Sequence, residues 1–131
     1  MRFLLDTNAL LFWLEGSRRI EKRLLARLVD PANAVYVSAV SGFEIAVKAS
    51  LKRLRLPDAP SKILPPFFTQ ASFTTLPITM EHSLGVFALP HHHSDPFDRL
   101  LVSQAIAEGL TLVTSDKILE QYPAKVILLA G

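Results

Sequence analysis

The sequence predicts an α/β fold, a three-layer sandwich in which a mostly parallel sheet of four to five strands lies between helices. Short apolar segments rich in β-formers alternate with segments whose apolar residues recur at helical spacing. Helices between strands are the usual crossover connections of a parallel sheet, and they cover both of its faces. The 131 residues suffice for one core, so we expect a single domain over residues 1–131.

The first half of the chain predicts two strands, over residues 3–5 and 35–37. Helices are expected over 9–14, over 17–29 with Ser17 as N-cap, from Ser38 or Ser41 to about 54, and briefly from about 61. The second and third of these helices each carry an apolar stripe, formed by Ile20, Leu24, Leu25 and Leu28, and by Val40, Phe43, Val47, Leu51 and Leu54, with Glu44 at its border.

The second half predicts strands over 73–76, 111–114 and 126–129. One helix over 80–88 follows the cap residue Thr79, and a short turn or helix leads through Tyr122. Asp95 and the proline after it are typical of a helix start, and Gly109 is typical of a helix end. A longer helix is therefore expected over 96–108.

Composition excludes several classes of protein. Half of the residues are hydrophobic and 20% are charged, which is typical of a globular chain. No apolar run reaches the roughly 18 to 20 residues that a membrane span needs, and the N-terminus does not resemble a signal peptide. The absence of cysteine excludes disulfides and thiolate metal sites. We expect a cytoplasmic protein without a membrane contact.

Basic residues form two clusters although the net charge is only +2. Either cluster could attract phosphate groups, or could be an ordinary solvated helix surface. The clusters consist of Arg18, Arg19, Lys22, Arg23 and Arg27, and of Lys48, Lys52, Arg53 and Arg55.

Three acidic residues follow the ends of predicted strands. Asp6 closes the first strand, Glu44 lies in the helix after the second, and Asp116 follows the fourth by two residues. The carboxyl ends of parallel strands share one edge of a sheet, and ligands of open α/β sheets bind there. Asp98, in the first turn of the helix that leads into the fourth strand, would be a further member. These four carboxylates are therefore predicted to be neighbours in space.

Each acid also has a structural explanation. Asp6 could cap the helix that follows it, and Glu44 could pair with Lys48 one turn further on. Asp98 could complete a capping box with the aspartate three residues before it, and Asp116 could form a turn. For residues taken one at a time, these alternatives stay open.

The helix that carries Asp98 favours metal binding. It is apolar on nearly every side and is expected to be buried, where a carboxylate is costly unless it is paired or binds a metal. Converging carboxylates repel one another until a cation neutralises them, and oxygen ligands suit Mg²⁺ or Mn²⁺. We predict a metal site that hydrolyses a phosphodiester through a metal-bound water. With Asp6 as a ligand, capping of the first helix is left to Thr7 or Asn8.

The consecutive histidines His91, His92 and His93 do not have the spacing of a transition-metal site. A role for His92 or His93 in positioning Asp95, or in contacting a phosphate, stays open. Whether Asp95 has a function beyond capping is open as well.

Five segments of the chain carry a family resemblance: residues 4–8 (LLDTN), 37–39 (VSA), 43–48 (FEIAVK), 92–101 (HHSDPFDRLL) and 110–116 (LTLVTSD). Through them the chain resembles the PIN-domain family, and more closely the VapC-type ribonuclease toxins of bacterial toxin–antitoxin pairs. The DPFDR block with the histidines before it is the most specific of these motifs. Relatives often have His where Asn8 stands and Trp where Phe43 stands, and neither departure removes a carboxylate.

The resemblance implies a metal-dependent endoribonuclease, with RNA as substrate, that a cognate VapB-type antitoxin holds inactive. It implies that Asp6, Glu44 and Asp98 bind Mg²⁺ or Mn²⁺, with Asp116 as a less constant fourth ligand. Neighbouring polar residues would orient carboxylates or waters, namely Thr7, Asn8, Ser38 and Ser115. We also expect a homodimer, since an antitoxin or a second subunit should cover exposed apolar residues.

Two rival functions are considered. A phosphotransferase of the haloacid dehalogenase type would use Asp6 as nucleophile, but it needs a second aspartate at position 8, where this chain has Asn8. A catalytically inactive interaction module would be expected to have lost at least one of the four acids. A Rossmann-type nucleotide binder is disfavoured, because no Gly-x-Gly-x-x-Gly follows the first strand.

Overall fold

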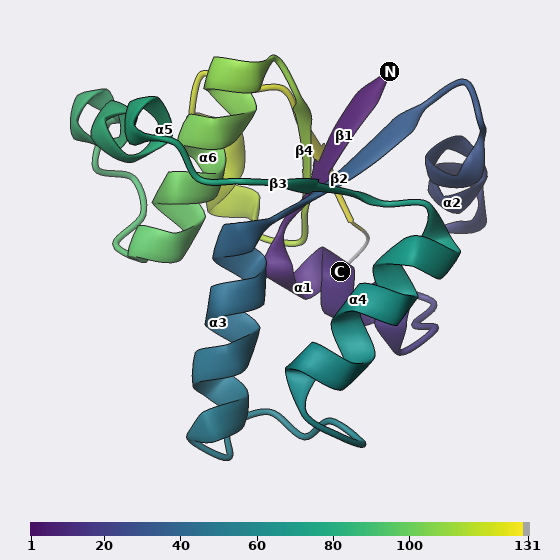
Figure 1. The fold of residues 1–131 in the computed structure, drawn as a ribbon. Coiled ribbons are helices and arrows are strands. Elements are labelled where there is room, and N and C mark those ends of the chain that lie inside the picture. Colours follow the sequence, from purple (N-terminus) through teal and green to yellow (C-terminus); the bar gives the residue numbers. More distant parts are fainter. Residues whose placement is uncertain (130–131) are drawn as a thin grey trace.

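The computed structural model describes residues 1–129 and confirms the predicted α/β sandwich (Figure 1). Its parallel sheet has the strand order β3-β2-β1-β4-β5. The central strand β1 pairs through Leu4 with Tyr36 on one side and Leu112 on the other. The strands are β1 Arg2–Leu5, β2 Ala34–Ser38, β3 Thr74–Leu76, β4 Thr111–Thr114 and β5 Val126–Leu128. Because all neighbours are parallel, their carboxyl ends lie at one edge.

The predicted helices are all present within residues 1–129, and none of them is long and apolar enough to cross a membrane. The α-helices are α1 Thr7–Leu14, α2 Lys22–Val29, α3 Ala39–Ser50, α4 Pro60–Ala71, α5 Met80–Gly85 and α6 Pro96–Glu108. Two short 3₁₀ helices are η1 Val86–Ala88 and η2 Lys117–Gln121.

Several predicted boundaries were wrong by a few residues. The second helix begins at Lys22 instead of Ser17, whose hydroxyl accepts a hydrogen bond from the Arg19 N–H at 3.2 Å and so forms a local turn. The third helix ends at Ser50, short of residue 54, because Lys52 adopts a left-handed conformation with φ 59°. The third and fifth predicted strands, 73–76 and 126–129, are each one residue shorter.

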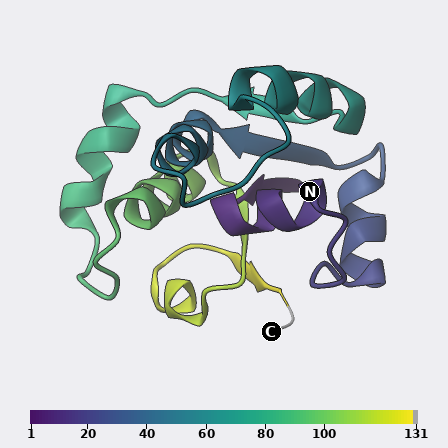
Figure 2. The same cartoon turned by 90° about the horizontal axis from the view of Figure 1, so that it is seen from below.

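The two faces of the sheet carry separate apolar clusters. Phe3, Leu5 and Val113 pack beneath α1, α2 and α4, whereas Leu4 and Leu112 pack beneath α6 and η2. Figure 2 shows α1 and α2 to one side of the strands and α5 and α6 to the other. This alternation along β1 follows from the pleat of a strand whose two faces are both buried.

Helix α3 departs from the predicted apolar stripe. Phe43 and Leu51, two members of that stripe, are exposed, while Ser41, Glu44 and Ile45 are buried. The prediction was wrong because α3 starts at the carboxyl edge of the sheet and packs against α1, α4 and α6. Its inner face therefore lines the edge where the acids converge, and polar residues occupy part of it.

Candidate metal centre

Asp6 joins the central strand to α1. Its backbone N–H donates to the Val113 carbonyl at 2.9 Å, which extends the sheet by one rung, and its Oδ1 accepts from the Ala9 N–H at 2.7 Å. Asp6 itself is therefore the N-cap of α1, and the prediction that Thr7 or Asn8 takes this role was wrong. Only one carboxylate oxygen of Asp6 forms the cap, so the other oxygen can contact a further group. The residue is buried, with 3% of its surface exposed.

Glu44 enters the same region from the second turn of α3. It is buried, and its Oε1 accepts a hydrogen bond from the Thr7 hydroxyl at 2.7 Å; that hydroxyl lies 2.9 Å from Ser41 Oγ. The alternative pairing with Lys48 is also present, with 2.6 Å between Lys48 Nζ and Glu44 Oε2. The lysine approaches from the solvent side, where its own side chain is half-exposed. Two different neighbours thus fix the two oxygens of Glu44.

Asp98 and Asp116 meet at the imidazole of His93. His93 Nε2 lies 2.7 Å from Asp116 Oδ2 and 3.3 Å from Asp98 Oδ2. The three side chains each offer one ligand atom within 4.8 Å of the others. Asp116 also caps η2 through its Oδ1, which accepts from the Ile118 N–H at 3.0 Å, so the alternative explanation of this residue as a turn former is present as well.

The tautomer of His93 follows from its other nitrogen. Nδ1 accepts a hydrogen bond from the Asp95 N–H at 2.9 Å, which leaves the ring proton on Nε2, facing the two aspartates. Asp95 in turn caps α6 through its Oδ1, which accepts from the Phe97 N–H at 2.8 Å. The predicted cap is confirmed, and the open role of His93 becomes a contact with both aspartates.

Burial and mutual repulsion raise the pKa values of two of the acids. Burial raises the pKa of Asp6 to about 6; a Thr114 hydroxyl bond and the Ala9 N–H oppose the rise, and the charges on Glu44 and Asp116 add to it. Ionisation of the Asp6 carboxyl therefore costs free energy in this environment.

Asp98 behaves in the same way. Burial raises the pKa of Asp98 to about 7, the charges on Asp95, Asp6 and Glu44 add to the rise, and His93 opposes it. Within residues 1–129, the ligand atoms that lie within 4.8 Å of one another belong to His93, Asp98 and Asp116, and the charges on Asp6 and Glu44 act on Asp98 from outside this group. A divalent cation would relieve this repulsion.

The structure thus brings the four predicted acids to one edge of the sheet, with His93 beside them. Of the predicted polar neighbours, Thr7 contacts Glu44, but Asn8 is exposed and Ser38 instead bonds to Gln104 Oε1 at 2.5 Å. Sequence reasoning missed the hydroxyl of Thr114, the last residue of β4. Its place at a strand end, next in line to Asp6, was the signal that could have identified it.

The donor set fits a hard divalent ion. Carboxylate oxygens are the ligands that Mg²⁺ and Mn²⁺ prefer, whereas both nitrogens of His93 are already used, Nδ1 by the Asp95 N–H and Nε2 by its own proton. Asp6, Glu44, Asp98 and Asp116 would supply oxygens, and within residues 1–129 they approach one another without enough basic partners to neutralise them.

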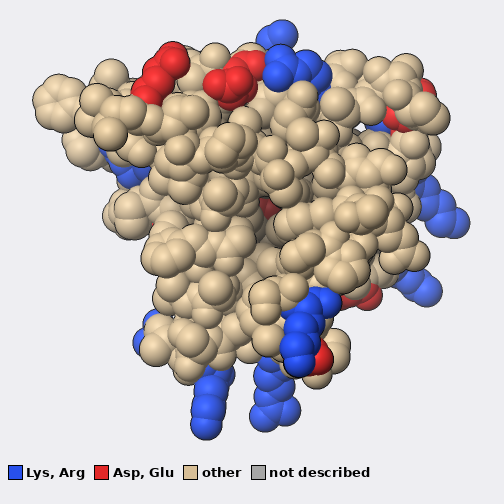
Figure 3. All heavy atoms as spheres, viewed as in Figure 1, with Lys and Arg blue, Asp and Glu red and all other residues tan. Residues whose placement is uncertain are grey.

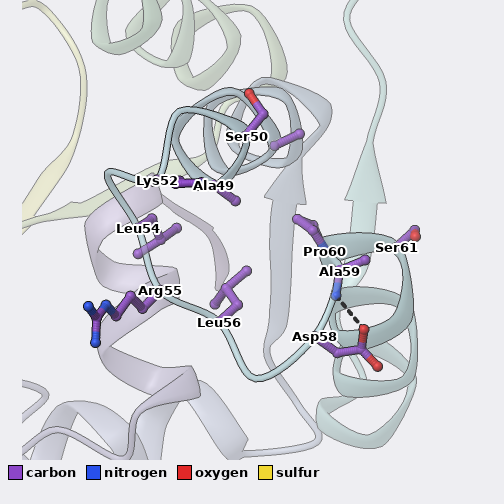
Figure 4. A pocket seen from close by; sticks show the side chains of 11 residues that line it. Ala49, Ser50, Lys52, Leu54, Arg55, Leu56, Asp58, Ala59, Pro60 and Ser61 are labelled. Carbon is purple, nitrogen blue, oxygen red and sulfur yellow. Dashed lines mark hydrogen bonds between the residues drawn. The ribbon is translucent and has the colours of Figure 1, made fainter.

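A separate pocket of about 730 Å³ lies away from the acids, between the end of α3, the loop that follows it and the start of α4 (Figure 4). Leu54 and Leu56 line it, Arg55 and Lys52 border it, and the Asp58 carboxylate is used by its own chain, accepting from the Ala59 N–H at 2.7 Å. The pocket is mainly apolar and holds no acid cluster.

In a parallel α/β domain, ligands bind outside the carboxyl ends of the strands, and this is the edge at which the acidic side chains lie. The family model of the PIN domain matches residues 3–125, and the chain belongs to the PIN-domain family.

Named proteins with similar sequence or structure agree with this assignment. The chain is 29% identical over 120 residues to Ribonuclease VapC22 of Mycobacterium tuberculosis, covering 91% of this chain and 90% of that protein. In structure it is similar to a chain of VapBC2 from Rickettsia felis bound to a DNA fragment from their promoter, with TM-score 0.75, 17% identity and coverage of 99% and 100%. DNA-bound VapBC from Salmonella typhimurium gives TM-score 0.66, 18% identity and 97% coverage of both chains.

Proposed function

We propose that this chain is a metal-dependent endoribonuclease and the toxic component of a bacterial type II toxin–antitoxin pair. The observation that carries the proposal is the convergence of four carboxylates at the carboxyl edge of the sheet, two of them with a raised pKa. The similarity to Ribonuclease VapC22 and membership of the PIN-domain family support RNA as the substrate. A cytoplasmic location accords with such a substrate.

Asp6, Glu44, Asp98 and Asp116 would hold Mg²⁺ or Mn²⁺. A bound ion would supply a water of lowered pKa as nucleophile and would stabilise charge on the phosphate oxygens. Hydrogen bonds from neighbouring residues orient these carboxylates. The Ala9 N–H holds one oxygen of Asp6, and Thr7 holds one oxygen of Glu44.

His93 completes this arrangement on the other side of the site. Its Nε2–H lies between Asp98 and Asp116 and restrains both side chains. The imidazole side chain is only 15% exposed, so little water competes for this proton. His93 thus holds a proton at the border between the acids and the substrate side of the site.

The surface around the acids suits a single-stranded RNA. Figure 3 shows acidic atoms recessed near the centre of this face, with basic side chains below, where Figure 1 places the end of α3 and the following loop. That loop and helix end contain Lys48, Lys52, Arg53 and Arg55. Basic groups beside a recessed acidic centre can bind the phosphates that flank the one to be cleaved.

An aromatic pair stands beside the acids. Phe43, which precedes Glu44 and is 60% exposed, packs against Phe97, which precedes Asp98, with ring centroids 5.9 Å apart at 67°. An exposed ring in this place can stack on an unpaired base. This favours single-stranded regions of RNA as the substrate.

The proposed partner is a VapB-type antitoxin, in line with the VapBC complexes among the structural relatives. A homodimer is proposed as well. The antitoxin and a second subunit would each cover exposed apolar side chains. Phe87 on η1 is 94% exposed, and the exposed Met80 and Leu84 lie on α5, which precedes η1 in the chain. Large exposed apolar residues in one region are typical of an interaction surface.

The metal is the most direct point to test. The purified chain, stripped with EDTA, should not cleave a fluorescent single-stranded RNA, and added Mg²⁺ or Mn²⁺ should restore cleavage. The matched control is Asp98→Asn, which should stay inactive with either ion. Cleavage by the EDTA-treated protein would contradict the metal mechanism, and hydrolysis of p-nitrophenyl phosphate without cleavage of RNA would favour the phosphotransferase alternative.

A further inference from the structure

Arg99 follows Asp98 directly, yet it points away from the acids and is only 7% exposed. Within residues 1–129 no carboxylate forms an ion pair with it. Its guanidinium instead donates to carbonyl oxygens, through Nη1 to Pro90 at 2.7 Å and through Nη2 to Val86 at 3.1 Å and Leu89 at 3.3 Å. A buried charge satisfied in this way clamps the chain segment that leads into the histidine loop.

Tyr122 lies at the end of η2, the short helix that Asp116 begins, and it is 3% exposed. Its hydroxyl oxygen accepts the backbone N–H of His93 at 2.9 Å and Nη1 of Arg99 at 3.1 Å. Its ring also packs edge-on against His92, with centroids 5.2 Å apart. A single buried oxygen therefore connects the arginine, the histidine loop and the segment of Asp116.

The side chain of His93 needs this restraint because its loop carries no regular structure. The segment 89–95 lies between η1 and α6, and its neighbours His91 and His92 are exposed. The imidazole must nevertheless reach Asp116 at 2.7 Å and Asp98 at 3.3 Å at the same time. A backbone shift of about 1 Å would lengthen the hydrogen bond to Asp116 beyond hydrogen-bonding distance and move Nε2 away from Asp98.

We propose that Tyr122 and Arg99 are positioning residues that act through His93: the Tyr122 hydroxyl, held by Arg99, fixes the His93 backbone so that its imidazole spans Asp98 and Asp116. The effect of this positioning on a preformed metal site rests on the proposed function, whereas the contacts of Tyr122, Arg99 and His93 do not. Removal of a residue that hydrogen-bonds to a metal-site residue and orients it typically weakens metal binding by about 10–100-fold.

The test uses Tyr122→Phe, which removes the hydroxyl and keeps the buried ring. The chain has one other tyrosine, so Tyr36→Phe on β2 is the matched control. In the metal-free proteins, the His93 Nε2–H resonance, identified by its loss in His93→Ala, should be sharp in the wild type and in Tyr36→Phe but broadened by exchange in Tyr122→Phe. Arg99→Lys, which lacks the planar fork, should broaden it as well.

Metal affinity gives a second measurement, with Mn²⁺ alone in a calorimeter. Tyr122→Phe should weaken Mn²⁺ binding about 10–100-fold, and in a His93→Ala background the same substitution should cause no further loss, because its effect passes through the imidazole. An equal loss in both backgrounds, or a sharp Nε2–H resonance with wild-type affinity in Tyr122→Phe, would overturn the proposal.

These results are separable from the proposed function. A wild-type protein that binds Mn²⁺ but cleaves no RNA would refute the ribonuclease and leave the resonance and affinity measurements decisive for the positioning role. In an active enzyme, Tyr122→Phe should lower kcat and leave KM for RNA unchanged, since the buried hydroxyl cannot contact the substrate.

Discussion

Asp6 combines two roles that are usually separate. As the N-cap of α1 it accepts a backbone N–H, which favours its ionised form, and as a buried member of an acidic cluster it is penalised for the same charge. The penalty is the larger effect, because the pKa of Asp6 is raised to about 6 despite the cap. The metal-free protein therefore carries a destabilising charge at the start of its first helix.

Asp6→Asn should stabilise the metal-free protein at pH 8. Asparagine is as good an N-cap as aspartate, so α1 keeps its cap while the buried charge is removed. The gain should be on the order of 3 kcal/mol, from a shift of roughly two pKa units at about 1.4 kcal/mol each. Urea unfolding of both proteins measures it, and loss of metal binding by the variant is expected alongside.

The pH dependence of this gain has a definite sign. A carboxyl whose folded pKa is raised binds more protons in the folded state than in the unfolded state, so the stability of the wild type should fall as pH rises from about 4 through about 6, where Asp6 titrates. Asp98, with a pKa of about 7, should extend the fall to slightly higher pH. Parallel stability curves for the wild type and Asp6→Asn would contradict this account.

Helix α6 illustrates what local sequence determines. Asp95, Pro96 and Gly109 predict its first and last turns because capping and left-handed termination depend on residues within one turn of the ends, and Gly109 indeed has φ 66°. The face of α3 was not predictable in this way. Its polar side is buried only because distant strands place acids beneath it, so the apolar residues Phe43 and Leu51 remain outside.

The site likewise has one part that could be predicted from the sequence and one part that could not. The four acids could be predicted because each follows a strand end or begins a helix, and parallel strands bring such positions to one edge. His93 could not be predicted as their partner. Its position depends on a loop held by Tyr122 and Arg99, which are 29 and 6 residues away, and no periodic pattern records such contacts.

Asp95 at the start of α6 allows the cap and the charge to be separated. Asp95→Ala should destabilise the protein by about 1 kcal/mol, because the Phe97 N–H loses its acceptor, whereas Asp95→Asn should retain the cap and the stability. Both variants should lower the pKa of Asp98, since the charge on Asp95 raises it. Thermal unfolding and carboxyl ¹³C titration by NMR measure the two effects.

A different outcome would change the role of Asp95. If Asp95→Asn were as unstable as Asp95→Ala, the carboxylate would matter through its charge at the helix N-terminus and not through the hydrogen bond to Phe97. If the pKa of Asp98 were the same in both variants as in the wild type, solvent would be screening the charge on Asp95 from Asp98.

For the whole molecule, the distribution of exposed apolar residues is uneven. Met80, Leu84 and Phe87 are among the most exposed large apolar side chains, and all lie on α5 and η1, which Figure 1 shows at one end of the molecule, outside α6. The basic helix α2 lies at the opposite end, where Arg19 stacks on Phe12 at 4.2 Å and Arg27 lies 5.5 Å from the Phe3 ring. Part of that basic cluster therefore has a structural role.

This asymmetry predicts where the proposed homodimer forms. Phe87→Glu, at a side chain 94% exposed, should leave the fold intact but place a charge within the interface, which disfavours association. Val29→Glu on α2, at a side chain 58% exposed, is the matched control and should leave association unchanged. In sedimentation equilibrium the wild type and Val29→Glu should be dimers and Phe87→Glu a monomer. A wild-type chain that stays monomeric at high concentration would refute the dimer, and a dimeric Phe87→Glu would move its interface elsewhere.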